Sequence, residues 1–195
     1  MKITGILLAA GSGSRFGGGK LLHPLPDGTP LGVASLRKLR SALADVLVVV
    51  RKGDEELRGL MLREGAAVQV CDDAHLGMAR SLICGIRAAA DADGWIIALG
   101  DMPYLSPATI SAVAAVVTGG AGIAMPEYRG ERGHPVGFGK RHLKELLELQ
   151  GDEGARALLK RHPREIETIA CDDPGVLRDI DRREDVEGIE DRGLG

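Results

Sequence analysis

Short apolar runs alternate with amphipathic segments over the first 120 residues of the chain. The runs predict buried strands, because they are too short for helices and rich in branched side chains. The segments between them have helical spacing, and one begins at Ser106 with Pro107 in its first turn, a common helix start. The expected strands span residues 3–9, 46–50, 67–70 and 95–99, and the expected helices span residues 31–43, 54–64, 78–90 and 106–117.

Strands that alternate with helices predict an α/β fold with a mainly parallel, Rossmann-like doubly wound sheet and helices on both of its faces. The alternation weakens after residue 120, where strands are expected at 122–125 and 134–138 and a helix at 153–161. No linker or repeat interrupts the chain, so residues 1–195 are expected to form one domain. Ligands of such sheets bind beyond the carboxyl ends of the strands, which is where candidate chemistry is sought.

The segment LAAGSGSRFGGGK follows the first expected strand and is rich in glycine. A glycine-rich turn between a strand and a helix presents backbone N–H groups to an anion and lets phosphate approach closely. Arg15 and Lys20 supply cations suited to phosphate oxygens. The Rossmann fingerprint fails at Phe16, and the P-loop fails at Leu21, which stands where Ser or Thr is required. The alternative is an exposed turn with two solvated cations.

A single carboxylate follows the strand expected at residues 95–99. Asp101 lies in the sequence LGDMP, at the same predicted sheet edge as the glycine loop. A carboxylate beside phosphate groups suits Mg²⁺, a hard cation with oxygen ligands. Asp101 could instead cap the next helix, but Ser106 already fills that position.

Composition narrows the classes of partner. The net charge is −3 and aromatic residues make up 3% of the chain, so neither a basic field nor stacking platforms for nucleic acid are expected. No apolar run approaches the roughly 20 residues that span a membrane. The three widely spaced cysteines form no metal-binding pattern, and reduced thiols are typical of a cytoplasmic protein. We therefore expect a cytoplasmic protein with neither nucleic acid nor membrane as a partner.

Five segments, in order, resemble nucleotidyltransferases that join a nucleotide to a phosphorylated acceptor. The resemblance is closest to the molybdenum-cofactor cytidylyltransferases and their guanylyltransferase relatives, and it covers nearly the whole chain. The family commonly ends in Asp-Ile-Asp-Thr-Pro-Glu-Asp, but here Arg182-Arg183 replaces Thr-Pro, which puts the local turn in question. The five segments are LAAGSGSRFGGGK, GDMP, GMARSL at 77–82, RGHPV at 132–136 and GDEGAR at 151–156.

The resemblance implies a fold like that of the nucleotide-diphospho-sugar transferases. It implies transfer of CMP from CTP to a molybdopterin-type cofactor, a phosphorylated pterin, with release of pyrophosphate and with Mg²⁺ as cofactor. The sequence Ala9-Ala10-Gly11 resembles the cytidylyl branch rather than the guanylyl branch. Residues 1–120 would hold the nucleotide and residues 121–195 the acceptor.

The resemblance also implies individual roles. Arg15, Lys20 and Asp101 would be catalytic, with Lys20 in an exposed loop and Asp101 joined in metal binding by Asp181 or Asp179. The acceptor would be bound by Arg132, His134 and Arg156. The nucleotide would be bound by Leu8, Ala9, Ala10, Gly11, Gly13, Lys20, Asp73, Gly77 and Ser81.

Plainer interpretations exist for several of these residues. Residues 77–81 could be an ordinary helix start, and His134 could be a core histidine. Arg156 could pair with a carboxylate on its own helix. The alternatives at the level of function are GTP-dependent guanylyl transfer, transfer to a sugar phosphate, or a nucleotide-binding chaperone that delivers the cofactor to a molybdenum hydroxylase.

Overall fold

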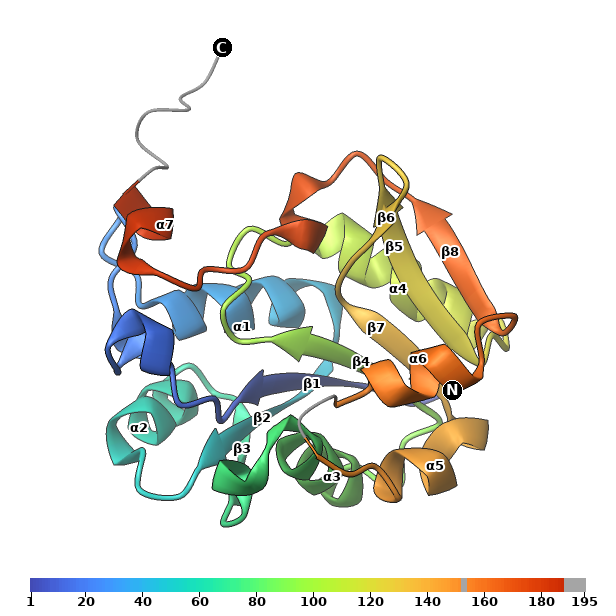
Figure 1. Ribbon diagram of the computed structural model, residues 1–195, viewed down its shortest axis with the longest axis horizontal. Helices are drawn as coiled ribbons and strands as arrows, with labels where there is room; N and C mark the ends of the chain where they lie inside the picture. The colour runs from blue at the N-terminus through green and yellow to red at the C-terminus, as the bar shows by residue number, and fades with distance from the viewer. Residues whose placement is uncertain (152–153, 188–195) are drawn as a thin grey trace.

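The computed structural model describes residues 1–151 and 154–187, and its centre is one open sheet (Figure 1). The strand order is β3-β2-β1-β4-β7-β5-β6, and β8 also pairs with β5. The strands are β1 (Ile3–Ala9), β2 (Asp45–Arg51), β3 (Ala67–Cys71), β4 (Gly94–Leu99), β5 (Ile123–Tyr128), β6 (Glu131–Arg132), β7 (Val136–Gly139) and β8 (Ile166–Ala170). The α-helices are α1 (Leu31–Ala42), α2 (Glu55–Arg63), α3 (Met78–Ala88), α4 (Pro107–Thr118), α5 (Leu143–Leu147), α6 (Arg156–Arg161) and α7 (Arg183–Glu187).

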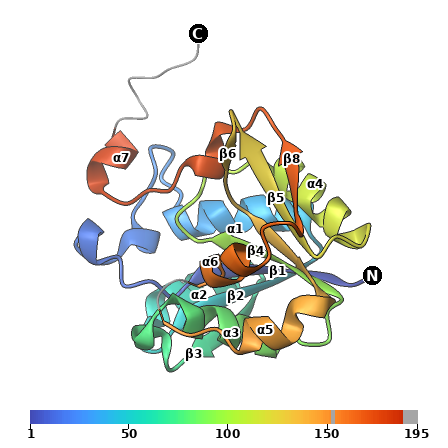
Figure 2. The same ribbon diagram turned by 45° about the vertical axis from the view of Figure 1, so that its right-hand side comes forward.

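Strands β3, β2, β1 and β4 are parallel and are apolar because both faces of this part of the sheet are covered. Successive side chains of β1 enter different cores: Leu7 packs in a cluster with side chains of α1 and α4, and Ile6 packs in a cluster with side chains of α3. Figures 1 and 2 show these helices on opposite sides of the sheet. The α/β class with helices on both faces is confirmed.

The second half of the sheet is mixed, which the sequence pattern did not predict. Strand β7 lies antiparallel between β4 and β5, and β8 runs parallel to β5. The expected strands at 122–125 and 134–138 correspond to β5 and β7. Strand β8 and helix α5 were not expected, because β8 carries Glu and Thr and is half exposed, and α5 has only five residues. The helix expected at 153–161 is described as α6, and residues 152 and 153 lie outside the described residues.

The carboxyl ends of β1 and β4 lie side by side and point toward α7 (Figure 1). The N–H of Gly100 donates to the carbonyl of Leu8 at 2.9 Å, and Ser35 Oγ on α1 donates to the carbonyl of Gly100 at 2.8 Å. Both bonds hold Gly100, the residue immediately before Asp101, and so position Asp101 beside the glycine loop. Within the described part of the chain, every helix is too short or too polar to cross a membrane.

Candidate functional site

Lys20 lies between two carboxylates at the carboxyl edge of the sheet. Its Nζ is 2.7 Å from Asp101 Oδ2 and 3.4 Å from Asp181 Oδ1. The Lys20 side chain is only 12% exposed, so the expectation that it stands in an exposed loop is wrong. The ion pairs explain the difference, because a cation between two carboxylates is held against the protein surface. Arg15 Nη1 lies 2.9 Å from Asp181 Oδ2 and remains largely exposed.

The glycine loop stands open above this cluster. It contains two short 3₁₀ turns, η1 (Ser14–Phe16) and η2 (Lys20–Leu22). Gly13, Gly17, Gly18 and Gly19 have φ between 59° and 91°, the left-handed region that glycine adopts without strain. A Cβ placed on Gly11 or on Gly17–Gly19 would meet no atom within 4 Å. This open space beside Lys20 leaves the loop backbone accessible to a ligand.

A small apolar cluster holds the glycine loop against the segment around Ile180 at this edge. Phe16 of the glycine loop packs with Leu31, Ile180 and Val186, all of them buried. The N–H of Ile180 donates to the carbonyl of Asp101 at 2.9 Å. Because Ile180 is anchored on both its backbone and its side chain, the flanking carboxylates are brought to Asp101.

The carboxylates of Asp101, Asp179 and Asp181 each offer an oxygen within 4.8 Å of the others. Asp101 Oδ1 is buried and has no hydrogen-bond partner among the described residues. Burial raises the pKa of Asp179, and nearby Asp101 adds to this effect. Burial also acts to raise the pKa of Asp181, but Arg15 and Lys20 outweigh it and the pKa is lowered. Clustered oxygens with an orphaned lone pair fit a hard divalent cation.

The family's Thr-Pro turn is replaced here without loss of the local cap. The carboxylate of Asp185 accepts the N–H groups of Asp181 and Arg182, at 2.9 and 2.7 Å. Arg182 and Arg183 line a cleft of about 380 Å³ together with Arg15, Phe16 and Glu184. Arg183 also stacks over the ring of Phe16. The departure from the family pattern therefore adds two cations beside the glycine loop.

The residues expected to read the base lie at the carboxyl end of β3. Asp73 is exposed and precedes the turn η3 (Ala74–Leu76). Gly77 has φ 123° and leads into α3, where Ser81 is 6% exposed. The N–H of Ala79 donates to the carbonyl of Gly151 at 3.3 Å, which brings the second half of the chain to this helix start. The base-reading role of these residues stays a prediction.

His134, which is expected to bind the acceptor, lies close enough to Asp101 for the charge of that carboxylate to act on its imidazole. Its Nδ1 is buried without a hydrogen-bond partner among the described residues. Burial lowers the pKa of His134, Asp101 opposes this change and Arg156 adds to it. Arg156 is exposed at the start of α6, and Arg132 is exposed on β6 of the β5–β6 hairpin.

His134 is positioned by a segment that was not expected from the sequence. The turn η5 (Pro174–Leu177) crosses the loop after β4, where the Asp173 carboxylate accepts from the backbone of Ser106 and from Thr109 Oγ1. The carbonyl of Val176 accepts the N–H of His134 at 2.9 Å. A Cβ on Gly133 would lie 2.2 Å from that carbonyl oxygen, so only glycine allows this approach. The Asp-Pro-Gly sequence at 173–175 is a turn signal that could have indicated the segment.

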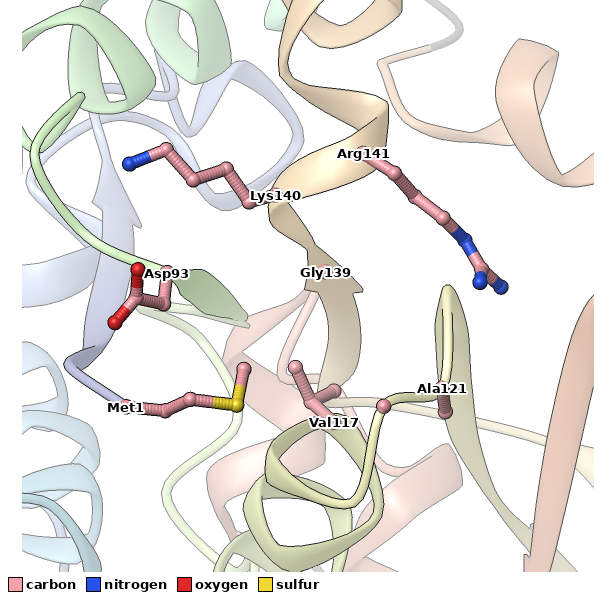
Figure 3. A pocket seen from close by; sticks show the side chains of 8 residues that line it. Met1, Asp93, Val117, Ala121, Gly139, Lys140 and Arg141 are labelled. Carbon is pink, nitrogen blue, oxygen red and sulfur yellow. The ribbon is translucent and has the colours of Figure 1, made fainter.

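A second hollow lies away from these residues. Met1, Asp93, Gly139 and Lys140 line it at the amino-terminal end of β4 (Figure 3). The hollow is therefore separate from the cluster that follows the carboxyl end of the same strand.

Comparison with known proteins agrees with this arrangement. Residues 5–166 match the family model described as a MobA-like NTP transferase domain. The purine catabolism protein PucB of Bacillus subtilis is 33% identical over 96% of this chain and 95% of its own length. The nicotine blue oxidoreductase of Paenarthrobacter nicotinovorans is 30% identical over 92% of both chains.

Solved structures show the same fold. Rv0371c from Mycobacterium tuberculosis in complex with manganese is 29% identical, with a TM-score of 0.81 over 99% of this chain and 100% of that chain. A CMP-2-keto-3-deoxy-manno-octonic acid synthetase complexed with CTP is 14% identical, with a TM-score of 0.77 over 98% of both chains. The expected likeness to nucleotidyltransferases in fold is thereby confirmed. This chain belongs to the MobA-like nucleotidyltransferase family.

Proposed function

We propose that the protein is a molybdenum cofactor cytidylyltransferase, which joins CMP from CTP to a molybdopterin-type acceptor and releases pyrophosphate. The observation that carries the proposal is the contact of Lys20 with both Asp101 and Asp181 beneath an open glycine loop. This arrangement offers a cation and backbone amides to a triphosphate and carboxylates to a metal ion. The choice of CTP rests on the resemblance of Ala9-Ala10-Gly11 to the cytidylyl branch of the family.

Positioning and charge stabilisation dominate this type of reaction. A phosphate oxygen of the acceptor forms a bond to the α-phosphorus of CTP as the bond to pyrophosphate breaks. The acceptor phosphate is already a nucleophile, so the protein needs no general base. Lys20 stabilises negative charge at the α-phosphate. Arg15 binds the departing pyrophosphate. It lines the same cleft as Arg182 and Arg183.

Mg²⁺ is the proposed cofactor. Asp101 and Asp181 would hold it, with Asp179 within reach. The ion neutralises phosphate charge when it is bound. Lys20 already bridges two of the carboxylates, so its ammonium group limits their mutual repulsion when the chain carries no ion.

A nucleotide panel tests the proposal. We expect pyrophosphate release that requires both a molybdopterin-type acceptor and CTP, with GTP a poor substitute. Release with GTP would support the guanylyl alternative, and release with a sugar phosphate as acceptor would support the sugar-phosphate alternative. Binding of CTP without pyrophosphate release from any acceptor would favour the chaperone that delivers cofactor to a molybdenum hydroxylase.

Acceptor binding is expected to depend on the second half of the chain. Replacing Arg132 by alanine or His134 by glutamine should raise the KM for the acceptor by about 10-fold or more, the scale of one lost charge-assisted hydrogen bond. CTP affinity should stay near that of the wild type, because neither residue lies on the glycine loop. Calorimetry measures the CTP affinity, and pyrophosphate release measures the acceptor dependence.

Arg58→Ala is the matched control, because Arg58 is a cation on α2 that pairs with Glu55 one turn before it. This variant should change neither the CTP affinity nor the KM for the acceptor. A loss of CTP affinity in the Arg132 and His134 variants would contradict the assignment of acceptor binding to this half of the chain.

A further inference from the structure

Two histidines and two glutamates converge at the edge of the sheet opposite the carboxylate cluster. His142 ends the turn η4 (Lys140–His142), Glu145 lies one turn later on α5, and His162 and Glu165 lie between α6 and β8. Strand β7 ends beside the start of β4, since Gly139 pairs with Gly94. The group therefore lies at the amino-terminal ends of the strands, whereas Asp101 follows their carboxyl ends. The proposed nucleotidyl transfer uses none of these four residues.

Glu145 bridges the two imidazoles. Its Oε1 lies 3.3 Å from Nδ1 of His142, and its Oε2 lies 2.8 Å from Nε2 of His162. One nitrogen from each ring and one carboxylate oxygen all lie within 4.8 Å of one another. Two imidazoles and a carboxylate form a common ligand set for Zn²⁺, with a further position open to water.

Glu165 faces the other side of both rings. Its Oε1 is 2.9 Å from Nδ1 of His162, and its Oε2 is 3.4 Å from Nε2 of His142. A carboxylate that accepts from the second ring nitrogen is the usual support of a metal-binding histidine, because it fixes the tautomer and the ring orientation. Glu165 gives this support to His162, and it lies within ion-pair distance of His142 Nε2, which forms no hydrogen bond among the described residues.

His142 is the buried member of this group. Its side chain is 3% exposed, yet Nε2 has no hydrogen-bond partner among the described residues. The site is nonetheless open to an ion, since Glu145 is 29% exposed and His162 is 25% exposed. A buried imidazole that faces exposed ligands is suited to hold an ion arriving from solvent.

Two arginines compete for the carboxylates from outside. Arg161 lies 3.4 Å from Glu145 and Arg141 lies 3.2 Å from Glu165, and both side chains are more than half exposed. Exposed ion pairs of this kind contribute little free energy, so Arg161 can leave Glu145 to a metal ion at small cost. Arg141 also lines the hollow of Figure 3.

We infer that His142, His162 and Glu145 form a binding site for a divalent transition-metal ion of the Zn²⁺ class, with Glu165 orienting His162. The ligands come from segments almost twenty residues apart and lie on either side of the connection from α5 to α6. A bound ion would therefore link the start of α5 to the residues after α6. The chain between them contacts the start of α3, where the N–H of Ala79 donates to the carbonyl of Gly151. The site stands independently of the proposed transferase chemistry.

Equilibrium dialysis of the chelator-treated protein against Zn²⁺, with Mg²⁺ in excess, tests the site. The wild type should bind about one zinc ion per chain, and zinc should raise its thermal denaturation temperature. His162→Ala and Glu145→Gln should weaken zinc binding by at least about 100-fold, and Glu165→Gln by about 10–100-fold, the range for a supporting residue. Glu145→Gln keeps the side-chain shape, so it decides the question if His162→Ala does not fold.

His75→Ala and Glu148→Gln are matched controls, an exposed histidine elsewhere and an exposed glutamate one turn after Glu145. Both should bind zinc as the wild type does. The inference is overturned if the wild type takes up no zinc, or if Glu145→Gln retains the wild-type affinity. It is also overturned if Asp101→Asn removes the zinc, because the ion would then belong to the carboxylate cluster.

Discussion

Replacement of Asp101 by asparagine is expected to lower metal-dependent turnover by about 10³-fold or more. A catalytic metal supplies several kcal/mol of charge stabilisation, and each loss of about 1.4 kcal/mol is tenfold in rate. Asp101 offers a buried oxygen with no other described partner, and asparagine keeps its shape but not its charge. Initial rates of pyrophosphate release, measured across a Mg²⁺ titration, give the effect. Circular dichroism and thermal denaturation establish that the variant is folded.

The same Mg²⁺ titration ranks the effects on turnover of replacing Asp179 and Asp181. Asp181→Asn should reduce turnover more than Asp179→Asn, because Asp181 is in direct contact with Arg15 and Lys20 of the glycine loop. Asp72→Asn is the control, since Asp72 lies at the same sheet edge but pairs with Lys52. Wild-type turnover in folded Asp101→Asn would refute the metal assignment, and the reverse order of Asp179 and Asp181 would refute the choice of Asp181 as the second metal ligand.

Replacement of Lys20 by alanine is expected to reduce turnover by about 10²-fold or more, the usual scale for one preorganised donor that stabilises transition-state charge. Lys20 lies 2.7 Å from Asp101 and 3.4 Å from Asp181, so its ammonium group is already in position before substrate arrives. Removing this cation leaves the carboxylates more negative. The affinity for Mg²⁺ should therefore be unchanged or higher, which separates the effect from loss of the metal.

Lys52→Ala is the matched control for Lys20. Lys52 also lies at the carboxyl edge of the sheet, but it is 73% exposed and pairs with Asp72. Its replacement should leave turnover near that of the wild type. If Lys20→Ala folds and turns over normally, or if it fails only because Mg²⁺ no longer binds, Lys20 does not act on the transferred phosphate.

The sequence by itself determined the parallel half of the fold. The apolar runs of β1, β2 and β4 are buried on both faces, and this burial leaves a continuous pattern that needs no tertiary information. The carboxyl ends of these strands meet at one edge, so the glycine loop and Asp101 were expected to lie together. That expectation is confirmed by the contact between Lys20 and Asp101.

Only the tertiary structure decided the rest of the site and the second half of the sheet. The antiparallel insertion of β7 and the edge strand β8 depend on pairing between distant segments, which short half-exposed strands do not encode locally. Asp179 and Asp181 reach Asp101 because Ile180 is anchored to Phe16 and to the carbonyl of Asp101, a contact across almost eighty residues. The burial of Lys20 between carboxylates and the convergence of His142 with His162 arise in the same way. A sequence names which groups are present, but the distance between two such groups depends on how the intervening chain folds.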